Sequence, residues 1–118
     1  MPLYDGQCHC GAVKFSFNSE PITSAMRCTC SICRRKNALM SDCYFEPDAF
    51  VRLKGEEHLT LYRWGDCDVN HYFCSHCGIY TFHDGVGSEG RYRVNLGCID
   101  DLDAHELALR VYDGKNLL

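Results

Sequence analysis

The chain of 118 residues contains ten cysteines, and these are the side chains most able to do chemistry. Seven of them fall into three short groups with the spacing of metal-ligand clusters. The groups are Cys8 and Cys10, then Cys28, Cys30 and Cys33, then Cys74 and Cys77. Thiolate sulfur is a preferred ligand of zinc, which takes four protein ligands in a structural site and keeps one position open in a catalytic site.

The first and third groups together predict a structural zinc site. Cys74 and Cys77 form a CxxC pair, and Cys8 and Cys10 are the pair best spaced to complete a site with them. A glycine follows each pair. A cysteine pair followed by glycine, called a knuckle, lets backbone N–H groups point at the thiolates. Four ligands from these pairs would tie the first strand to a late hairpin, a large constraint on a small core. The alternative is a set of reduced core cysteines without metal.

The middle group predicts a different kind of site, because it has three cysteines and no fourth one nearby. Three protein ligands with an open position are typical of catalytic zinc, so all three cysteines are candidate catalytic residues. Zinc with three thiolates carries a charge of about −1 and is suited to holding an incoming thiol as thiolate. The alternative is a second structural zinc, whose fourth ligand is Cys43, Cys67, Cys98 or a histidine.

The remaining cysteines and two histidines carry weaker signals. We expect Cys98 and Cys43 to be small buried residues and Cys67, in a polar stretch, to be a surface thiol. His71 and His83 could supply a proton relay beside the zinc-bearing hairpins, or they could pack as ordinary polar residues.

Charge limits the range of partners. The formal net charge is −4, which argues against a nucleic-acid partner and against a general phosphate-binding surface. The basic run Arg34–Arg35–Lys36 directly follows the middle cysteines. It could receive the carboxylates of a glutathione-like thiol, or it could be the solvated face of a short helix.

The elements that must position these residues are mostly strands. Alternation of apolar and polar residues, with turn signals between the segments, predicts strands near 13–17, 39–45, 50–53, 59–64, 69–73, 79–82, 91–96 and 107–111. One short helix is expected from Ser31, as its N-cap, through Asn37. We therefore expect a mainly β protein of small antiparallel sheets stapled by zinc, with residues 1–118 forming a single domain.

Nothing in the sequence predicts export or membrane insertion. The first residues lack a basic stretch followed by an apolar run, and no segment approaches the ~20 apolar residues of a membrane span. We expect a cytoplasmic protein with no membrane partner, where thiols stay reduced and dense cysteines hold metal more often than disulfides.

Four ordered blocks carry a resemblance that covers most of the chain. They are Gly6–Val13, Cys28–Arg35, His71–Tyr80 and Tyr92–Asp101. Together they resemble the motifs of the glutathione-dependent formaldehyde-activating enzyme family, also called the centromere protein V family. The resemblance implies a β-tent fold, shared with methionine sulfoxide reductase B and a Rab-binding zinc protein family. It also implies a structural zinc on Cys8, Cys10, Cys74 and Cys77 and a catalytic, labile zinc on Cys28, Cys30 and Cys33.

The activity implied by the resemblance is that of a zinc-dependent carbon–sulfur lyase. Its partners would be a small thiol such as glutathione and a small carbonyl compound such as formaldehyde, joined as S-(hydroxymethyl)glutathione. Thr29 stands where relatives often have His or Asn, which removes a hydrogen-bonding side chain but no ligand. A non-catalytic, zinc-stapled binding module is the alternative. A methionine sulfoxide reductase would need Cys98 as a redox-active cysteine with Cys43 or Cys67 as its partner.

Overall fold

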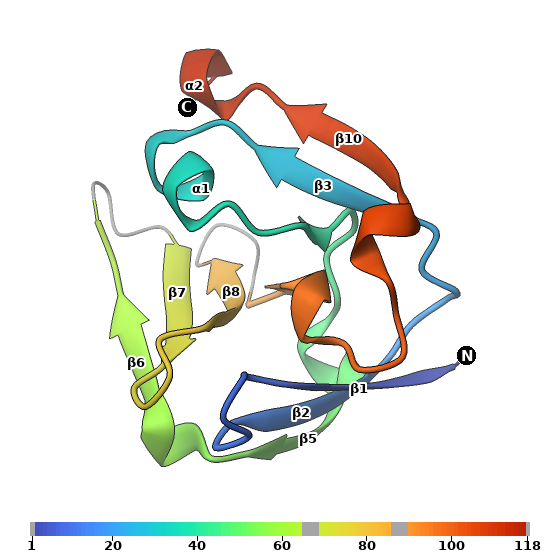
Figure 1. The fold of residues 1–118 in the computed structure, drawn as a ribbon, viewed down its shortest axis with the longest axis vertical. Coiled ribbons are helices and arrows are strands. Elements are labelled where there is room, and N and C mark those ends of the chain that lie inside the picture. The colour runs from blue at the N-terminus through green and yellow to red at the C-terminus, as the bar shows by residue number, and fades with distance from the viewer. Residues whose placement is uncertain (1, 65–68, 86–89, 118) are drawn as a thin grey trace.

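The computed structural model describes residues 2–64, 69–85 and 90–117, which build three small sheets (Figure 1). The first sheet has the order β1 (Leu3–Gln7), β2 (Lys14–Asn18) and β5 (Phe50–Lys54) and is antiparallel. The second, also antiparallel, has the order β6 (Leu59–Tyr62), β7 (Val69–Cys74), β8 (Tyr80–Gly85) and β9 (Tyr92–Val94). The third has the order β10 (Ala108–Tyr112), β3 (Ser24–Cys28) and β4 (Met40–Ser41). The mainly β fold expected from the sequence is confirmed.

Helices are few and short in the described part of the chain. They are α1 (Ser31–Lys36) and α2 (Gly114–Leu117), together with 3₁₀ turns at Pro47–Ala49, Glu56–His58, Leu96–Cys98 and Ala104–Glu106. Only α1 was expected, and its N-cap is Cys30 rather than Ser31. It ends at Asn37, which takes the left-handed conformation with φ 53° and donates its N–H to the Cys33 carbonyl. Six residues are too few for a helix that is stable alone, so its surroundings must hold α1 in place.

Two strands were not predicted from the sequence. In β1, Gly6 interrupts the alternation of apolar and polar residues by which a strand is predicted. Glycine is needed at this position because a Cβ would lie 2.7 Å from the Phe15 ring. In β3, the sequence Ser-Ala-Met-Arg-Cys lacks a clear alternation. The strand expected at 39–45 is reduced to the two residues of β4 and an isolated bridge between Phe45 and Tyr92.

The third sheet corrects the expectation of purely antiparallel pairing. Strands β3 and β10 run parallel, in a register that pairs Ser24 with Ala108 and Cys28 with Tyr112. Parallel strands need a long connection, and here the whole second sheet lies between them in the sequence. The pairing brings the end of β10, and the chain that follows it, beside Cys28 and α1, as the upper part of Figure 1 shows.

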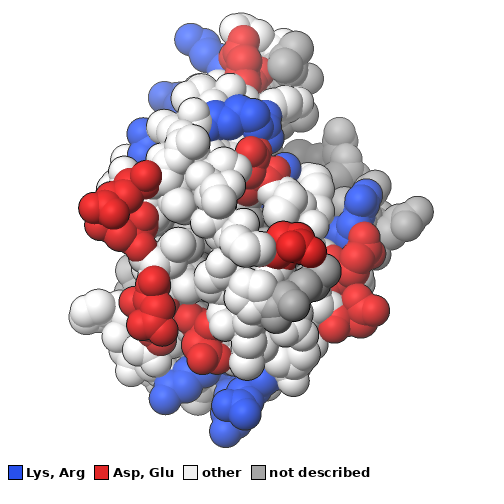
Figure 2. Space-filling view, turned by 90° about the vertical axis from the view of Figure 1, so that its right-hand side faces the viewer, with Lys and Arg blue, Asp and Glu red and all other residues white. Residues whose placement is uncertain are grey.

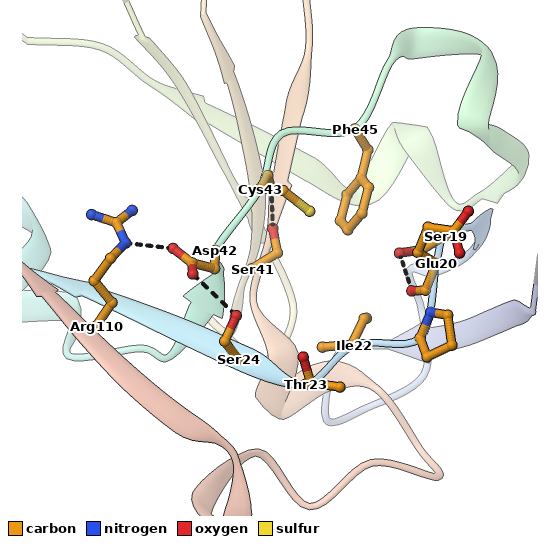
Figure 3. Close-up of a pocket in the computed structure, with 11 residues that line it drawn as sticks. Ser19, Glu20, Ile22, Thr23, Ser24, Ser41, Asp42, Cys43, Phe45 and Arg110 are labelled. Carbon is orange, nitrogen blue, oxygen red and sulfur yellow. Dashed lines mark hydrogen bonds and ion pairs between the residues drawn. The ribbon is translucent and has the colours of Figure 1, made fainter.

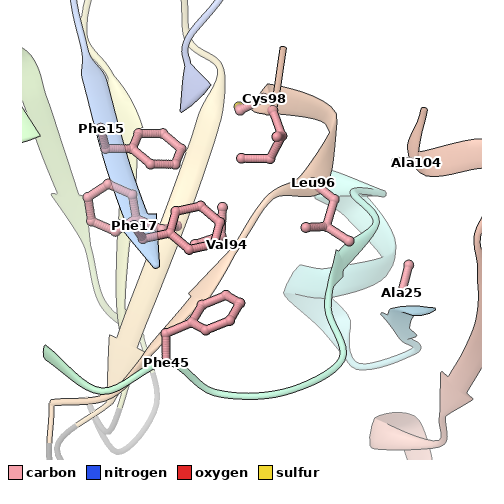
Figure 4. Close-up of a cluster of buried hydrophobic side chains, with 10 residues drawn as sticks. Phe15, Phe17, Ala25, Phe45, Val94, Leu96, Cys98 and Ala104 are labelled. Atoms are coloured by element: carbon pink, nitrogen blue, oxygen red, sulfur yellow. The ribbon is translucent and has the colours of Figure 1, made fainter. Parts of the chain in front are cut away.

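The main core joins the first sheet to the second and is rich in phenylalanine (Figure 4). Phe15 and Phe17, two residues apart on β2, are both buried. The Phe15 ring lies 5.5 Å from that of Phe82 on β8, and the Phe17 ring lies 4.8 Å from that of Phe45. Burial of each such side chain contributes about 2 kcal/mol, so this core fixes the sheets on which the cysteine-bearing loops are mounted.

Charged side chains are mixed on the face shown in Figure 2. Lysine and arginine occur there in separate groups with aspartate and glutamate between them, rather than as one continuous basic area. In the described part of the chain, no helix is both long enough and apolar enough to span a membrane.

Candidate metal centres and their surroundings

Four cysteines meet where the β1–β2 loop lies against the β7–β8 turn. The set comprises Cys8, Cys10, Cys74 and Cys77, called here the four-cysteine cluster, and its Sγ atoms all lie within 4.8 Å of one another. Two of the Sγ–Sγ distances, from Cys10 to Cys8 and to Cys74, are 3.7 Å. Zn–S bonds of about 2.3 Å in a tetrahedron require sulfurs about 3.8 Å apart. The donor set therefore fits a zinc ion.

The backbone around the four-cysteine cluster is shaped to stabilise thiolates. Val13 donates its N–H to Cys8 Sγ at 3.3 Å, and His76 donates to Cys74 Sγ at 3.4 Å. The glycines after the two pairs, Gly11 and Gly78, have φ of 81° and 76°, which side-chain-bearing residues rarely adopt. These knuckles are the reason why a glycine follows each cysteine pair.

The thiols of this cluster differ in acidity. Burial opposes ionisation of Cys77, but N–H groups of Cys10 and Ile79 outweigh it and lower the pKa of Cys77 to about 6. At Cys10 the N–H of Ala12 favours the thiolate, but burial and the neighbouring thiols raise its pKa to about 11. Cys77 is therefore more readily ionised than Cys10, and a cation among the sulfurs would favour the thiolate form of both.

Cys28, Cys30 and Cys33 form a second group, called here the three-cysteine cluster, with Sγ atoms that again lie within 4.8 Å of one another. Cys28 ends β3, Cys30 caps α1, and Cys33 lies on the first turn of α1, three residues from Cys30 and on the same face. No fourth histidine, cysteine, aspartate or glutamate joins the group among the described residues. Cys67, one alternative fourth ligand, lies outside the described residues.

Ionisation in the three-cysteine cluster is also uneven. Burial disfavours the Cys30 thiolate, but the N–H of Cys33 and bonds from the neighbouring thiols outweigh it and lower the pKa of Cys30. Burial raises the pKa of Cys33 to about 12, although the charge of Lys36 works against it. Cys30 is thus more readily ionised than Cys33.

A cavity of about 340 Å³ opens beside Cys30. Its lining residues are Thr29, Cys30, Ser31, Arg34, Trp64, Gly114 and Lys115. Two cationic side chains and one indole thus line a cavity to which Cys30, the residue with the lowered thiol pKa, also contributes. The basic run after the cysteines divides: Arg34 faces this cavity, Arg35 donates to the Ser31 carbonyl at 2.9 Å, and the Lys36 ammonium is buried.

The C-terminal turn forms one wall of this cavity, and the sequence analysis did not single it out. A Cβ at Gly114 would lie 2.5 Å from Cys28 Sγ and 2.9 Å from Cys30 Cβ. A bare backbone is therefore needed here, and the Asp-Gly pair in the sequence was the signal that could have marked it.

Thr29, which stands where relatives often have His or Asn, makes hydrogen bonds of its own. Its hydroxyl accepts a hydrogen bond from the Lys115 N–H at 3.2 Å and lies 3.4 Å from both the Tyr112 carbonyl and an Asp113 carboxylate oxygen. The residue between Cys28 and Cys30 thus fastens the C-terminal turn to the three-cysteine cluster.

The two histidines considered as a relay meet through Tyr80. The Tyr80 hydroxyl lies 2.7 Å from His71 Nδ1 and 2.8 Å from His83 Nδ1. Because a hydroxyl has one proton to donate, one imidazole donates to Tyr80 and the other accepts from it. Burial lowers the pKa of His71 to about 4 and that of His83 well below its ordinary value, so both rings are neutral at pH 7. A role in proton transfer stays a prediction.

Cys98 and Cys43 belong to neither cluster. Cys98 is buried, as expected, and its thiol lies 3.6 Å from the Tyr80 carbonyl. Cys43 is exposed, so the expectation that it is a buried residue is wrong. It lines a larger cavity, of about 410 Å³, whose walls include the Asp42–Arg110 ion pair at 2.6 Å (Figure 3). Neither cysteine cluster contributes a residue to this cavity.

The chain is similar to known proteins both in fold and in sequence. A crystal structure of a Rhodobacter sphaeroides protein superposes with a TM-score of 0.78 at 33% sequence identity, covering 90% of this chain and 99% of that one. A Halomonas elongata protein named "Putative glutathione-dependent formaldehyde-activating enzyme" is 34% identical over 83 residues, which are 64% of this chain and 52% of that protein. The chain thus matches about half the length of this curated relative.

The family model for "Glutathione-dependent formaldehyde-activating enzyme" matches residues 3–113. This span contains both cysteine clusters and the strands that carry them. The chain therefore belongs to the glutathione-dependent formaldehyde-activating enzyme family.

Proposed function

We propose that the protein is a zinc-dependent carbon–sulfur lyase that acts on the adduct of a small thiol and a small carbonyl compound. The adduct suggested by the family is S-(hydroxymethyl)glutathione, made from glutathione and formaldehyde. The observation that carries the proposal is the three-cysteine cluster, which has no fourth protein ligand among the described residues and adjoins an open cavity.

Each cluster would have its own role. The four cysteines fit a closed structural zinc site, and the three cysteines fit a zinc site with one position left for a ligand from solution. A zinc ion in the second site would supply a means to keep a thiol in its thiolate form near neutral pH without destroying its nucleophilicity.

The chain's own residues would bind and orient the reactants. Arg34 and Lys115 line the cavity and provide positive charge for the carboxylates of a glutathione-like thiol. Trp64 on the same wall provides an apolar surface for the rest of the molecule. Holding thiol and carbonyl together in one cavity converts a bimolecular encounter into a local one.

The bond changes balance without a further reactant. In the synthetic direction the thiolate sulfur attacks the carbonyl carbon, a C–S bond forms, and the C=O π pair moves to oxygen. That oxygen then takes a proton, equal to the one the thiol lost, and the product is a hydroxymethyl thioether. The lyase direction is the reverse.

A methionine sulfoxide reductase activity is less consistent with the described residues. That chemistry needs an accessible thiolate, whereas Cys98 is buried and its burial raises its pKa to about 12. Cys43 is exposed and lines the separate, larger cavity.

The test is metal content measured beside catalysis. Wild-type protein should hold two zinc ions per chain and should accelerate the formaldehyde-dependent loss of glutathione thiol above the protein-free rate. Cys30→Ser should hold one zinc and lose the acceleration. The matched control is Cys43→Ser, since Cys43 is an exposed cysteine outside both clusters and should leave both measurements unchanged.

Two outcomes would count against the lyase. A wild-type protein with two zinc ions and no acceleration would favour the non-catalytic binding module. Equal activity in Cys30→Ser and wild type would remove the three-cysteine cluster from the reaction.

A further inference from the structure

The side chain of Lys36, at the last position of α1, turns into the protein instead of into solvent. Its Nζ is buried and has no hydrogen-bond partner among the described residues. It lies 4.0 Å from the centroid of the Tyr80 ring. Arg34 and Arg35, immediately before it, are both exposed. The inward direction of Lys36 is therefore specific to that residue and is not a property of the basic run.

An ammonium group without acceptors is costly to bury, and a single aromatic ring offsets only part of that cost. Cys33 lies three residues before Lys36 on the same face of α1, and Tyr80, over which the ammonium lies, packs against the buried group that includes Cys28 and Cys30. Burial is the largest influence on the pKa of Lys36 and lowers it, whereas negative charge on Cys33, Cys30 and Cys28 would raise it. Arg93 acts in the opposite direction. The electrostatic partner of Lys36 is thus the three-cysteine cluster.

The neighbouring groups do not replace Lys36 as a cation. His71, which is buried, and His83, which is half-buried, are joined by Tyr80 and are both neutral at pH 7. The charge of Lys36 is one of the causes that lower the pKa of each. Tyr80 itself is held as the neutral phenol, because burial and the charges of Cys33 and Cys30 raise its pKa. Among Lys36, His71, Tyr80 and His83, only Lys36 therefore supplies a positive charge beside the three-cysteine cluster.

A divalent metal with three thiolates carries a charge of about −1, and one ammonium balances it. A further thiolate in the open position would add one more negative charge. Binding it would cost less free energy with the Lys36 ammonium nearby than without it. We propose that Lys36 is the counter-charge of the three-cysteine cluster and gives its open position a preference for an anionic thiolate over a neutral sulfur ligand. This inference rests on the proposed function, and it makes Lys36 a positioning residue that acts through the cluster.

The experiment compares Lys36→Met, Lys36→Arg and, as a matched control, Lys54→Met on the exposed end of β5. The affinity of the second zinc is measured by competition with a chelator. Binding of glutathione and of S-methylglutathione is measured by calorimetry on the zinc-loaded protein. The two ligands differ by one methyl group on sulfur, which prevents the sulfur from becoming a thiolate.

Lys36→Met should weaken the second zinc roughly tenfold or more. It should also reduce the preference for glutathione over S-methylglutathione by a similar factor. Lys36→Arg should retain most of both effects, and Lys54→Met should match wild type. The Tm of protein loaded only at the four-cysteine cluster should stay equal or rise in Lys36→Met, because an unpaired buried charge has been removed.

Different results would contradict the proposed function and the role of Lys36. A wild-type protein that takes up one zinc would overturn both the proposed function and this inference. Two zinc ions with unchanged zinc affinity and unchanged ligand preference in Lys36→Met would overturn the role of Lys36 alone. A lower Tm or loss of folding in Lys36→Met would also overturn it, since a merely structural lysine would behave in that way.

Discussion

The two cysteine clusters are built on opposite plans. The four-cysteine cluster joins two loops that are far apart in the sequence, and each loop contributes two sulfurs through a glycine-bearing knuckle. The three-cysteine cluster comes from one continuous segment, the end of β3 and the start of α1. Its second side consists of backbone at Gly114 and a buried ammonium at Lys36.

The difference shows how the same ligand type can serve two purposes. Sulfurs from distant loops cross-link the fold when a metal binds them, so metal affinity becomes folding free energy. Sulfurs from one local segment add little cross-linking. They leave room for a cavity that the C-terminal turn helps to line.

The largest expected effect is the contrast between Cys74→Ser and Cys30→Ser. A structural zinc contributes on the order of 10 kcal/mol, about as much as the whole stability of a domain, so Cys74→Ser should unfold the protein. Cys30→Ser should stay folded and lose only the second metal. Circular dichroism during a thermal melt measures both. Equal destabilisation by the two substitutions would contradict the division of roles.

Gly114→Ala tests whether the C-terminal turn shapes the three-cysteine cluster. The new Cβ would lie 2.5 Å from Cys28 Sγ, so the turn must shift at a cost of about 1–3 kcal/mol. Zinc content should fall from two ions to one, with the four-cysteine cluster still loaded. Gly97→Ala is the control, because its nearest contact is the Asn95 Oδ1 at 3.2 Å. Retention of both metals in Gly114→Ala would mean that the turn does not shape the site.

Acid should lower the free energy of unfolding through protonation of the buried His71. The pKa of folded His71 is about 4, below its ordinary value of 6.5, so the unfolded chain takes up the proton first. The stability due to neutral His71 is complete above pH 6.5 and is lost as the pH falls towards 4, by about 1–2 kcal/mol after solvent screening.

Urea unfolding at several pH values measures this dependence. His71→Gln should flatten the dependence between pH 6.5 and pH 4, and the exposed His105→Gln should not. An equal slope in His71→Gln and wild type would assign the acid sensitivity to other groups, such as the thiolates of the clusters.

Thr29→Val should give the smallest effect. It removes the hydroxyl that accepts from the Lys115 N–H, a loss of about 1 kcal/mol confined to the C-terminal turn. Amide hydrogen exchange at Lys115 should accelerate, while exchange in the β7–β8 hairpin beside the four-cysteine cluster stays unchanged. Acceleration at both places would mean that the turn is coupled to the whole fold.

The sequence predicted those features that depend on local chemistry. The grouping of the cysteines follows from short spacings and adjacent glycines, and most strands follow from the alternation of apolar residues. Strand β1 was missed because Gly6 is chosen for its contact with Phe15, which lies in another strand. The roles of Gly114 and Lys36 were missed for the same reason, since each depends on a partner brought near only by the fold.

The parallel pairing of β3 with β10 has a consequence for the order of folding. A chain emerging N-terminus first presents both halves of the four-cysteine cluster once residue 77 has appeared, well before β10 exists. Pairing between strands so distant in sequence forms slowly. The four-cysteine cluster can therefore assemble while the chain is still incomplete. The three-cysteine cluster acquires one wall of its cavity only when the final strand docks, so this cavity is completed after the rest of the protein is in place.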